Sequence, residues 1–202
     1  MHKPVIQAAL AALFIATPAL ANSNTVTFED LPLYQPAASF SSGGFTFSSS
    51  WYGNVYDNQE VIHLDGVNVY NGTQYLIWGW GAGGVLDIRR DDNAQFDLAS
   101  LDLGNSYYTN GGGAVSLSAD FASGGKFTTT LALSDSFQTF KLGLSGLSAL
   151  HLSRVEDGTQ DSYTALDNLN VAAVPEPETY AMLLAGLMVV GFATQRRKNR
   201  QP

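Results

Sequence analysis

The chain of 202 residues has room for one domain and additional segments, since a domain usually holds about 100–200 residues. It contains no cysteine, which excludes a disulfide scaffold, a thiolate zinc site and a cysteine nucleophile. The formal net charge of −8 argues against a protein that binds nucleic acid. Hydrophobic residues make up 45% of the chain and charged residues only 14%, so a disordered polar chain is also excluded.

The N-terminal end has the three parts of a secretory signal peptide. Met1-His2-Lys3 gives a positive start, Val5–Ile15 is apolar, and Ala19-Leu20-Ala21 forms an A-x-A cleavage site. We therefore expect a signal peptide over residues 1–21 and export through the Sec machinery. A buried N-terminal helix is the alternative.

The central residues 22–171 follow the period-two pattern of β-strands. Alternate side chains are apolar in Ala114–Phe121, and Gly124-Gly125 separates this segment from Lys126–Leu133, as in a hairpin. Clusters of glycine, asparagine, aspartate and serine divide the other segments. The remaining expected strands are Thr25–Phe28, Gly44–Ser48, Glu60–His63, Val67–Tyr70, Tyr75–Trp80, Val85–Arg89, Phe96–Leu103, Phe140–Leu144, Leu147–Val155 and Tyr163–Val171.

This pattern predicts an all-β fold, with a single β-sandwich or jelly-roll domain of about ten strands. A signal-peptide helix precedes the domain in this prediction, and a hydrophobic helix follows it. Removing Glu176 and Glu178 from the 18 acidic residues leaves 16 in the domain, against five basic ones, so its formal charge is −11. Such a surface favours divalent cations and polyhydroxylated partners over phosphate polymers.

Two segments resemble the opening and closing strands of exported jelly-roll modules. They are Thr25-Val26-Thr27-Phe28-Glu29-Asp30-Leu31 and Ala165-Leu166-Asp167-Asn168-Leu169-Asn170-Val171. The resemblance implies that the two strands lie side by side. It also implies a structural calcium ion at that place, as carbohydrate-binding modules of this shape often have.

Asp167 alternates in phase with Ala165 and Leu169, so a regular strand would direct it toward the apolar side. A buried carboxylate is costly without a partner, and sites rich in oxygen ligands suit Ca²⁺. We hypothesise a structural Ca²⁺ held by Glu29 or Asp30 together with Asp167 and backbone carbonyls. The alternative is that Asp167-Asn168 lies at a bulge or turn and caps backbone groups.

A group of aromatic residues stands beside Asn54, Asp57 and Gln74, whose polar side chains suit sugar hydroxyls. Flat aromatic rings stack on the apolar faces of sugars, and Ser48–Asn54 is expected to be a loop. The candidate carbohydrate-binding residues are Trp51, Tyr52, Tyr56, Trp78 and Trp80. Packing in the core is the alternative role for these rings.

The domain shows no catalytic motif, so we expect a protein that is not an enzyme. Neither His63 nor His151 lies in an H-E-x-x-H sequence, and no G-x-S-x-G elbow occurs. No pair of acids stands out for glycoside hydrolysis, although two carboxylates would suffice for it. A small secreted glycan hydrolase or lyase is the alternative.

The C-terminal end has three parts in order. Val174-Pro175-Glu176-Pro177-Glu178 precedes an apolar run, Tyr180–Thr194, and a basic tail that contains Arg196, Arg197, Lys198 and Arg200. The positive-inside rule keeps this tail in the cytoplasm and places the domain outside. The apolar run is shorter than the about 20 residues that span a bilayer core, which makes it a marginal membrane anchor.

This arrangement over residues 172–202 resembles the PEP-CTERM sorting signal, which is also called the ice-binding protein C-terminal motif. The resemblance implies export by a Gram-negative bacterium and processing by an exosortase at Pro175, Glu176 and Pro177. The two prolines keep such a segment extended and free of helical hydrogen bonds, so a membrane enzyme can reach it. Proteins with this signal accompany exopolysaccharide production and biofilm formation.

Together these patterns predict an exported, non-catalytic surface or extracellular-matrix protein that binds exopolysaccharide. We expect the precursor to be anchored in the inner membrane by its C-terminal helix, with the domain facing the periplasm. The processed protein is expected at the cell surface or outside the cell. Ice binding is a further alternative, which rests on the second name of the signal alone.

Overall fold

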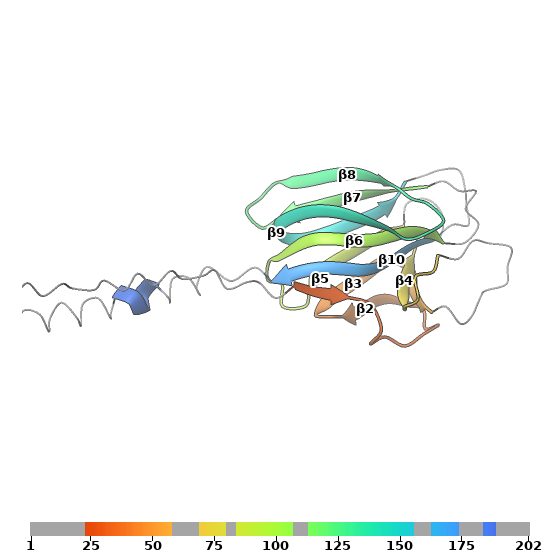
Figure 1. Ribbon diagram of the computed structural model, residues 1–202, viewed down its shortest axis with the longest axis horizontal. Coiled ribbons are helices and arrows are strands. Elements are labelled where there is room, and N and C mark those ends of the chain that lie inside the picture. The colour runs from red at the N-terminus through yellow and green to blue at the C-terminus, as the bar shows by residue number, and fades with distance from the viewer. Residues whose placement is uncertain are drawn as a thin grey trace, which may run out of the picture.

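The computed structural model describes residues 23–57, 69–79, 84–106, 113–155, 163–173 and 184–188, apart from the side chains at 51, 52 and 56. The described residues form ten strands (Figure 1). These are β1 (Ser23–Val26), β2 (Ala37–Ser42), β3 (Phe45–Tyr56), β4 (Tyr75–Trp78), β5 (Val85–Arg90), β6 (Phe96–Ser106), β7 (Ala114–Phe121), β8 (Lys126–Ala132), β9 (Gln138–Arg154) and β10 (Tyr163–Ala173). The predicted all-β class is confirmed.

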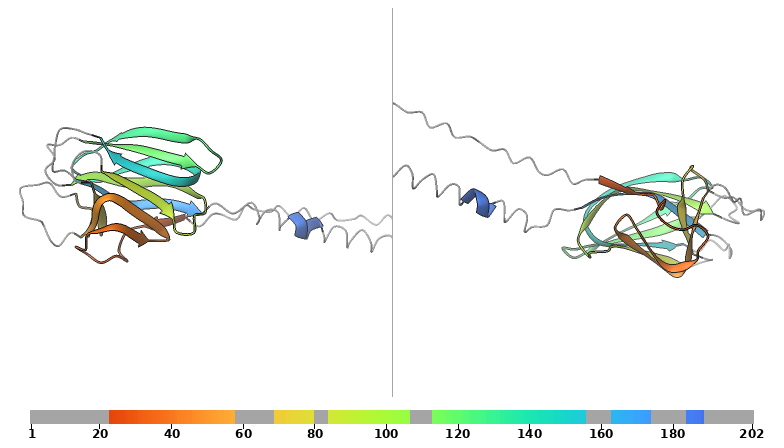
Figure 2. Two further views of the ribbon diagram at one scale, coloured as in Figure 1. Left: turned by 180° about the vertical axis from the view of Figure 1, so that it is seen from behind. Right: turned by 90° about the horizontal axis from the view of Figure 1, so that it is seen from below.

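Hydrogen bonds connect these strands into one sheet. The path β10-β4-β3-β5-β9 closes into a ring because β6 pairs with both β9 and β10. β1 lies beside β10, β2 pairs with β3, and β7 and β8 continue the sheet beyond β9. Views from behind and from below show the strands around a common interior (Figure 2). The sequence predicted a sandwich or jelly roll, whereas the hydrogen bonds describe one continuous, barrel-like sheet.

The longest strand, β9, joins two segments that the sequence pattern separates. Its first half pairs with β6, and its second half pairs with β5 and β7. Gly143 and Gly146 have φ angles of 62° and 72° in the middle of the strand, a conformation that glycine adopts at little cost. These glycines interrupt the apolar alternation where β9 changes partners, and the sequence therefore suggests two strands.

The sequence prediction omits β2, because Ala37–Ser42 is polar and carries few apolar side chains. The strand forms because Gly43-Gly44, with φ angles of 57° and 81°, makes a two-residue hairpin turn into β3. By contrast, β7 has the predicted bounds. The expected strand Glu60–His63 lies outside the described residues, and Val69 and Tyr70, the described part of another expected strand, do not belong to any strand.

One core fills the interior of the sheet. Phe28 and Phe47 meet edge to face with ring centroids 5.0 Å apart, and Phe45 packs in the same way on Phe96 at 5.2 Å. A second, smaller cluster contains Val69, Tyr75, Ile77 and Ala165, with Phe137 and Tyr163 packed against it. The second cluster shows that parts of β4 and β10 are covered on both faces, which sets the surroundings of Asp167.

Both ends of the domain lie at the same end of the sheet. Ser23, the first residue of β1, pairs with Ala172 of β10 (Figure 1). The predicted side-by-side placement of the opening and closing strands is therefore confirmed. Beyond β10, residues 184–188 are helical, with exposed Leu184, Leu187 and Met188. Among the described residues, no helix has the length and apolar character needed to cross a membrane.

Candidate functional site

Asp167 lies on β10 at a break in the regular pairing with β6. The register shifts after Asp167↔Asp102, and the next residue, Asn168, has a φ of 46°. The bulge changes the alternation, so Leu169 and Val171 join the main core while Ala165 belongs to the second cluster. The sequence-based alternative that placed Asp167-Asn168 at a bulge is correct, and the assumption of an unbroken alternation from Ala165 to Leu169 is wrong.

The Asp167 carboxylate is fully buried and only half satisfied. Its Oδ2 accepts hydrogen bonds from Asn71 Nδ2 at 2.6 Å and from Thr73 Oγ1 at 2.7 Å. Its Oδ1 is buried and has no hydrogen-bond partner. An unpaired carboxylate oxygen in the interior is costly, so this atom marks a place where a cation or proton would be favoured.

A second carboxylate stands directly across the strand pair. Asp102 of β6 pairs in register with Asp167, and Asn168 Nδ2 donates to Asp102 Oδ2 at 2.8 Å. Burial raises the pKa of Asp167 above its ordinary value of 3.8, and the Asp102 charge acts in the same direction. The hydrogen bonds from Asn71 and Thr73 oppose this rise in the pKa without cancelling it. Two facing acids with one free buried oxygen define what we name the Asp167 site.

The structure does not bring the three predicted calcium ligands together. Glu29 Oε1 accepts from the Gln74 backbone N–H at 2.7 Å, whereas Asp30 Oδ1 accepts from Ser42 Oγ at 2.5 Å. Within the described ranges, no group of three or more His, Cys, Asp or Glu side chains is arranged to hold a metal ion. The segment 71–74 nevertheless contacts Asp167 at one end and Glu29 at the other.

Sequence reasoning missed the partners of Asp167. Asn71 and Thr73 are recognisable in the sequence only as part of an Asn-Gly turn, and Asp102 lies 65 positions before Asp167 in the chain. Only the pairing of β6 with β10 brings the two acids together. Gln74, one of the polar residues proposed to read sugar hydroxyls, instead directs its side-chain amide at backbone carbonyls. With its nitrogen facing them, it donates to Phe28 O at 2.8 Å and Leu31 O at 3.1 Å.

The candidate sugar-binding residues have different outcomes. Trp78 is fully buried in the core, so its ring cannot stack on a sugar, and that part of the prediction is wrong. Trp51 and Tyr52 belong to β3 rather than to the expected loop. Tyr56 is the last residue of β3, and the side chains of all three residues are not described. Trp80 lies outside the described residues.

The residues assigned to sorting lie outside the part of the chain that the structure describes. The signal-peptide positions are Ala19 and Ala21, the exosortase positions are Pro175, Glu176 and Pro177, and the orienting basic positions are Arg196, Arg197, Lys198 and Arg200.

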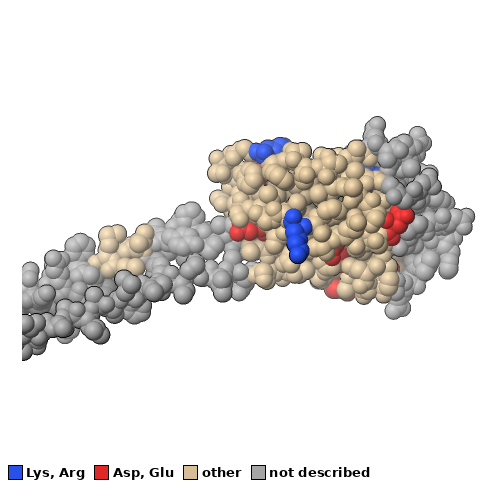
Figure 3. Space-filling model, turned by 45° about the horizontal axis from the view of Figure 1, so that its top comes forward, with Lys and Arg blue, Asp and Glu red and all other residues tan. Residues whose placement is uncertain are grey.

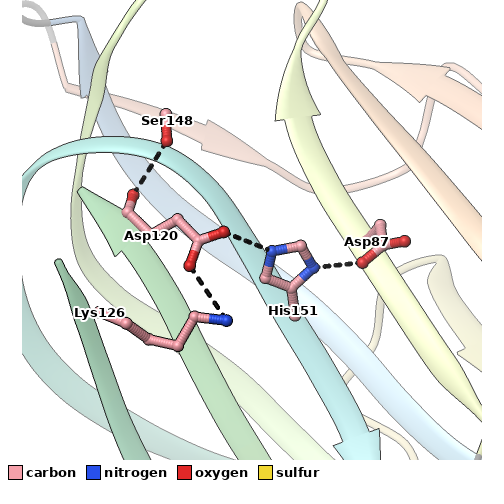
Figure 4. Close-up of polar contacts among 5 residues, drawn as sticks. All are labelled: Asp87, Asp120, Lys126, Ser148 and His151. Atoms are coloured by element: carbon pink, nitrogen blue, oxygen red, sulfur yellow. Dashed lines mark hydrogen bonds and ion pairs between the residues drawn. The ribbon is translucent and has the colours of Figure 1, made fainter. Parts of the chain in front are cut away.

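A chain of polar contacts crosses the outer side of β5, β9, β7 and β8 (Figure 4). His151 Nδ1 contacts Asp87 Oδ1, and His151 Nε2 lies 3.1 Å from Asp120 Oδ2. Asp120 Oδ1 pairs with Lys126 Nζ at 3.2 Å. A carboxylate on each ring nitrogen requires two protons on the imidazole, so both contacts are satisfied together only by a protonated histidine. His151 is therefore held in its strand by hydrogen bonds to side chains of both neighbouring strands.

The contacts of Asp120 predict a loss of stability in acid. The hydrogen bonds from His151 and Lys126 lower the pKa of Asp120 below its ordinary value of 3.8. A lowered pKa in the fold adds stability above pH 3.8, and this stability is lost as the pH falls through the lowered pKa. In thermal unfolding measured at a series of acid pH values, the Tm of Asp120→Asn should therefore fall less with decreasing pH than the Tm of the wild type. Equal losses would contradict this role for the carboxylate.

Charge on the described surface is dispersed. In the face drawn in Figure 3, basic side chains are separated from one another by uncharged surface, and acidic side chains lie toward the ends and the lower edge of the domain. The described residues on this face form no basic patch of the kind that follows a phosphate backbone.

Comparisons with known proteins identify the C-terminal end. A family model, the PEP-CTERM protein-sorting motif, matches residues 173–198. This match confirms the predicted signal and implies an exported protein that is sorted by an exosortase. The motif begins at Ala173, the last residue of β10, so the folded domain leads directly into the sorting segment. The comparison with curated protein sequences found no match.

Solved structures similar to this chain include three carbohydrate-binding modules. A mutant of CBM29-2 in complex with mannohexaose has a TM-score of 0.45 and 17% identity, with 76% of this chain and 92% of that chain covered. TmCBM61 in complex with β-1,4-galactotriose has a TM-score of 0.44 and 8% identity, with coverages of 73% and 94%. The CBM22-1 xylan-binding domain from Paenibacillus barcinonensis Xyn10C has a TM-score of 0.43 and 13% identity, with 77% of this chain and 97% of that chain covered. At these low scores, the likeness assigns no ligand to this chain.

Proposed function

We propose that this chain is an exported, non-catalytic protein of the cell surface or extracellular matrix whose single all-β domain, residues 22–171, binds polysaccharide. The observation that carries the proposal is the sorting motif that begins where β10 ends. Because β1 also starts at this end of the sheet, the chain enters and leaves the domain at the same end. Release by an exosortase would place this surface in the exopolysaccharide of a biofilm.

The aromatic residues of β3 are the proposed sugar-binding residues. Trp51, Tyr52 and Tyr56 follow one another along the strand, beside the partly exposed Asn54 and Asp57. Asp57 accepts a hydrogen bond from Tyr34 Oη at 2.7 Å, which holds the end of β3 against the preceding segment. Aromatic residues that alternate with polar residues along a chain can supply the stacking and hydroxyl contacts that a neutral polysaccharide needs.

Substitution of these aromatic residues tests the proposal. In affinity gels that contain an exopolysaccharide, the wild-type protein should be retarded. A Trp51→Ala/Tyr52→Ala variant should lose roughly tenfold or more in affinity if the two rings are binding hot spots. Tyr70→Ala is the matched control, because Tyr70 is an exposed tyrosine outside this group. Retardation of the double variant equal to that of wild type would contradict the assignment, and absence of retardation on every polysaccharide would contradict the function.

The runner-up function is glycan hydrolysis, for which two facing acids of the described sheet are one candidate pair. Asp102 and Asp167 are the acids that the sheet places opposite one another. Asp167 is fully buried beneath Asn71 and Thr73, so a glycosidic bond cannot reach it. Hydrolysis needs two carboxylates on either side of the scissile bond, so Asp102 and Asp167 are not such a pair.

We also propose that the Asp167 site takes a structural Ca²⁺. The free, buried Oδ1 of Asp167 would supply one ligand, and Asp102, which pairs in register with Asp167, would supply a second carboxylate. Calcium prefers carboxylate and amide oxygens, and its charge would offset the repulsion between the two facing acids. This ligand set replaces Asp30, which Ser42 already engages, and leaves Glu29 holding the 71–74 segment.

A further inference from the structure

The strand β8 is an open edge of the sheet. Within the described chain it pairs with β7 on one side, and no strand pairs with its other side. Its register with β7 is unbroken from Ala114↔Ala132 to Asp120↔Lys126. The other edges are less regular, since β1 has only four residues and β2 has a register shift against β3. An edge that is long, extended and free of bulges is a template for pairing with another strand.

Backbone hydrogen bonds define which groups of β8 are open. Leu133 N donates to Gly113 O at 2.8 Å, and Gly125 O accepts from Phe121 N at 3.2 Å, so odd-numbered residues here face β7. Successive residues of a strand direct their N–H and C=O groups to opposite sides. The backbone groups of Thr128, Thr130 and Ala132 therefore point away from β7, at the open edge.

The one charged residue of β8, Lys126, does not protect this edge against pairing with another strand. A lysine on an edge strand normally discourages pairing, because a partner strand would have to cover its charge. Lys126 instead pairs with Asp120 of β7 at 3.2 Å, so its side chain is directed over β7 and away from the open edge (Figure 4). The rest of the strand is Phe-Thr-Thr-Thr-Leu-Ala, without proline and rich in β-branched residues that favour pairing.

We propose that the protein associates with a second copy of itself by antiparallel pairing of β8 with β8. Full overlap of the two strands centres the pair on Thr129, places Thr128 opposite Thr130 of the other copy, and places Lys126 opposite Ala132. No like charges meet in this register, and threonine pairs form across the junction. The even-numbered residues exchange their open N–H and C=O groups. This inference stands on the edge geometry and does not depend on polysaccharide binding.

The pairing direction connects association with sorting. β8 runs along the long axis of the domain, and β1 begins and β10 ends at one end of that axis (Figure 1). Antiparallel pairing puts these ends on opposite sides of the pair. Two copies that are anchored in one membrane by their C-terminal segments point the same way and therefore cannot pair their β8 strands antiparallel. Copies that have been released from the membrane can turn and pair.

A single cysteine tests the register, because the chain contains no cysteine of its own. In the full-length chain, purified in mild detergent and treated with oxidised glutathione, Thr129→Cys should form a disulfide-linked dimer. Thr129 meets its own copy in a non-hydrogen-bonded pair, where the Cα atoms lie about 4.5 Å apart, within the range of disulfides. Ser116→Cys is the matched control, since Ser116 lies one strand inward, roughly 14 Å from its copy across three strand spacings.

A proline variant tests the open edge without disturbing the fold. Thr130→Pro removes an N–H that faces outward and leaves the bonds to β7 in place, so it should sediment as a monomer under conditions where the wild type dimerises. Cross-linking of Thr129→Cys but not of Ser116→Cys, together with the loss of dimerisation in Thr130→Pro, would support the proposal. No cross-link at position 129, equal cross-linking of both cysteine variants, or unchanged association of Thr130→Pro would overturn it. Retardation in polysaccharide gels, measured in parallel, separates this outcome from failure of the proposed function.

Discussion

The Asp167→Asn variant is expected to lose the stabilisation that calcium gives the wild-type protein. A ligand that binds only the folded state stabilises it by about 2.7 kcal/mol at a hundred times its Kd. For a domain of this size, that corresponds to roughly 5–10 °C in Tm. The substitution places a neutral amide where the free Oδ1 of Asp167 now lies, so the principal charged ligand would be absent.

The same variant should behave differently from the wild type as the pH changes in the presence of a chelator. Burial and the Asp102 charge raise the pKa of Asp167 above 3.8, so the fold favours its protonated form. The calcium-free wild type therefore gains stability as the pH falls through the raised pKa and loses it as the pH rises again. A neutral amide does not titrate, so Asp167→Asn should lack this component of the pH dependence.

Thermal unfolding with calcium and with EDTA measures both effects. Asp30→Asn is the matched control, because the structure places Asp30 on Ser42 rather than in the Asp167 site. We expect the control to keep the calcium-dependent rise in Tm and Asp167→Asn to lose it. A wild-type Tm that is the same with calcium and with EDTA would contradict the calcium proposal.

Trp78→Ala is expected to cause the largest loss of stability. The ring is fully buried in the core cluster, and removal of a buried aromatic side chain costs about 3–5 kcal/mol through lost transfer energy and the remaining cavity. Folded molecules of the variant should still bind polysaccharide, because the buried ring offers no face to a sugar.

Urea unfolding and affinity gels separate these two expectations. Tyr70→Ala serves as the control, since Tyr70 is 49% exposed and its loss should change stability by about 0.5 kcal/mol or less. A near-wild-type free energy of unfolding for Trp78→Ala would contradict the buried position of the ring. Selective loss of binding with unchanged stability would instead restore its predicted role in sugar binding.

The sequence predicts the strands best where one face is apolar and the turn is marked by glycine. β7 matches the predicted bounds, and Gly124-Gly125 separates it from β8 with φ angles of 91° and 94°. β2 is missed because its polar residues carry no alternation, and it exists through its pairing with β3. The closure of the sheet through β6 depends on long-range pairing, which local alternation does not encode.

The candidate site is predictable only in part. Asp167 is conspicuous in the sequence because it interrupts an apolar strand, and the neighbouring bulge is one of the two interpretations that the sequence allows. Its partner acid could not be predicted, because the choice of Asp102 over Glu29 or Asp30 is made by the register of β6 on β10. The link from His151 to Asp87 and Asp120 has the same origin, since three separate strands contribute one side chain each.

The central claim, an exported domain that is sorted through its C-terminal motif, is tested most directly by intact mass. The protein would be purified from each cell fraction of its native host and its mass measured without digestion. The account predicts a released form that starts at Asn22 and ends near Pro175–Pro177, shortly after β10. A lasting membrane form that retains Arg196–Arg200 in every fraction would contradict processing and make the C-terminal end a permanent anchor.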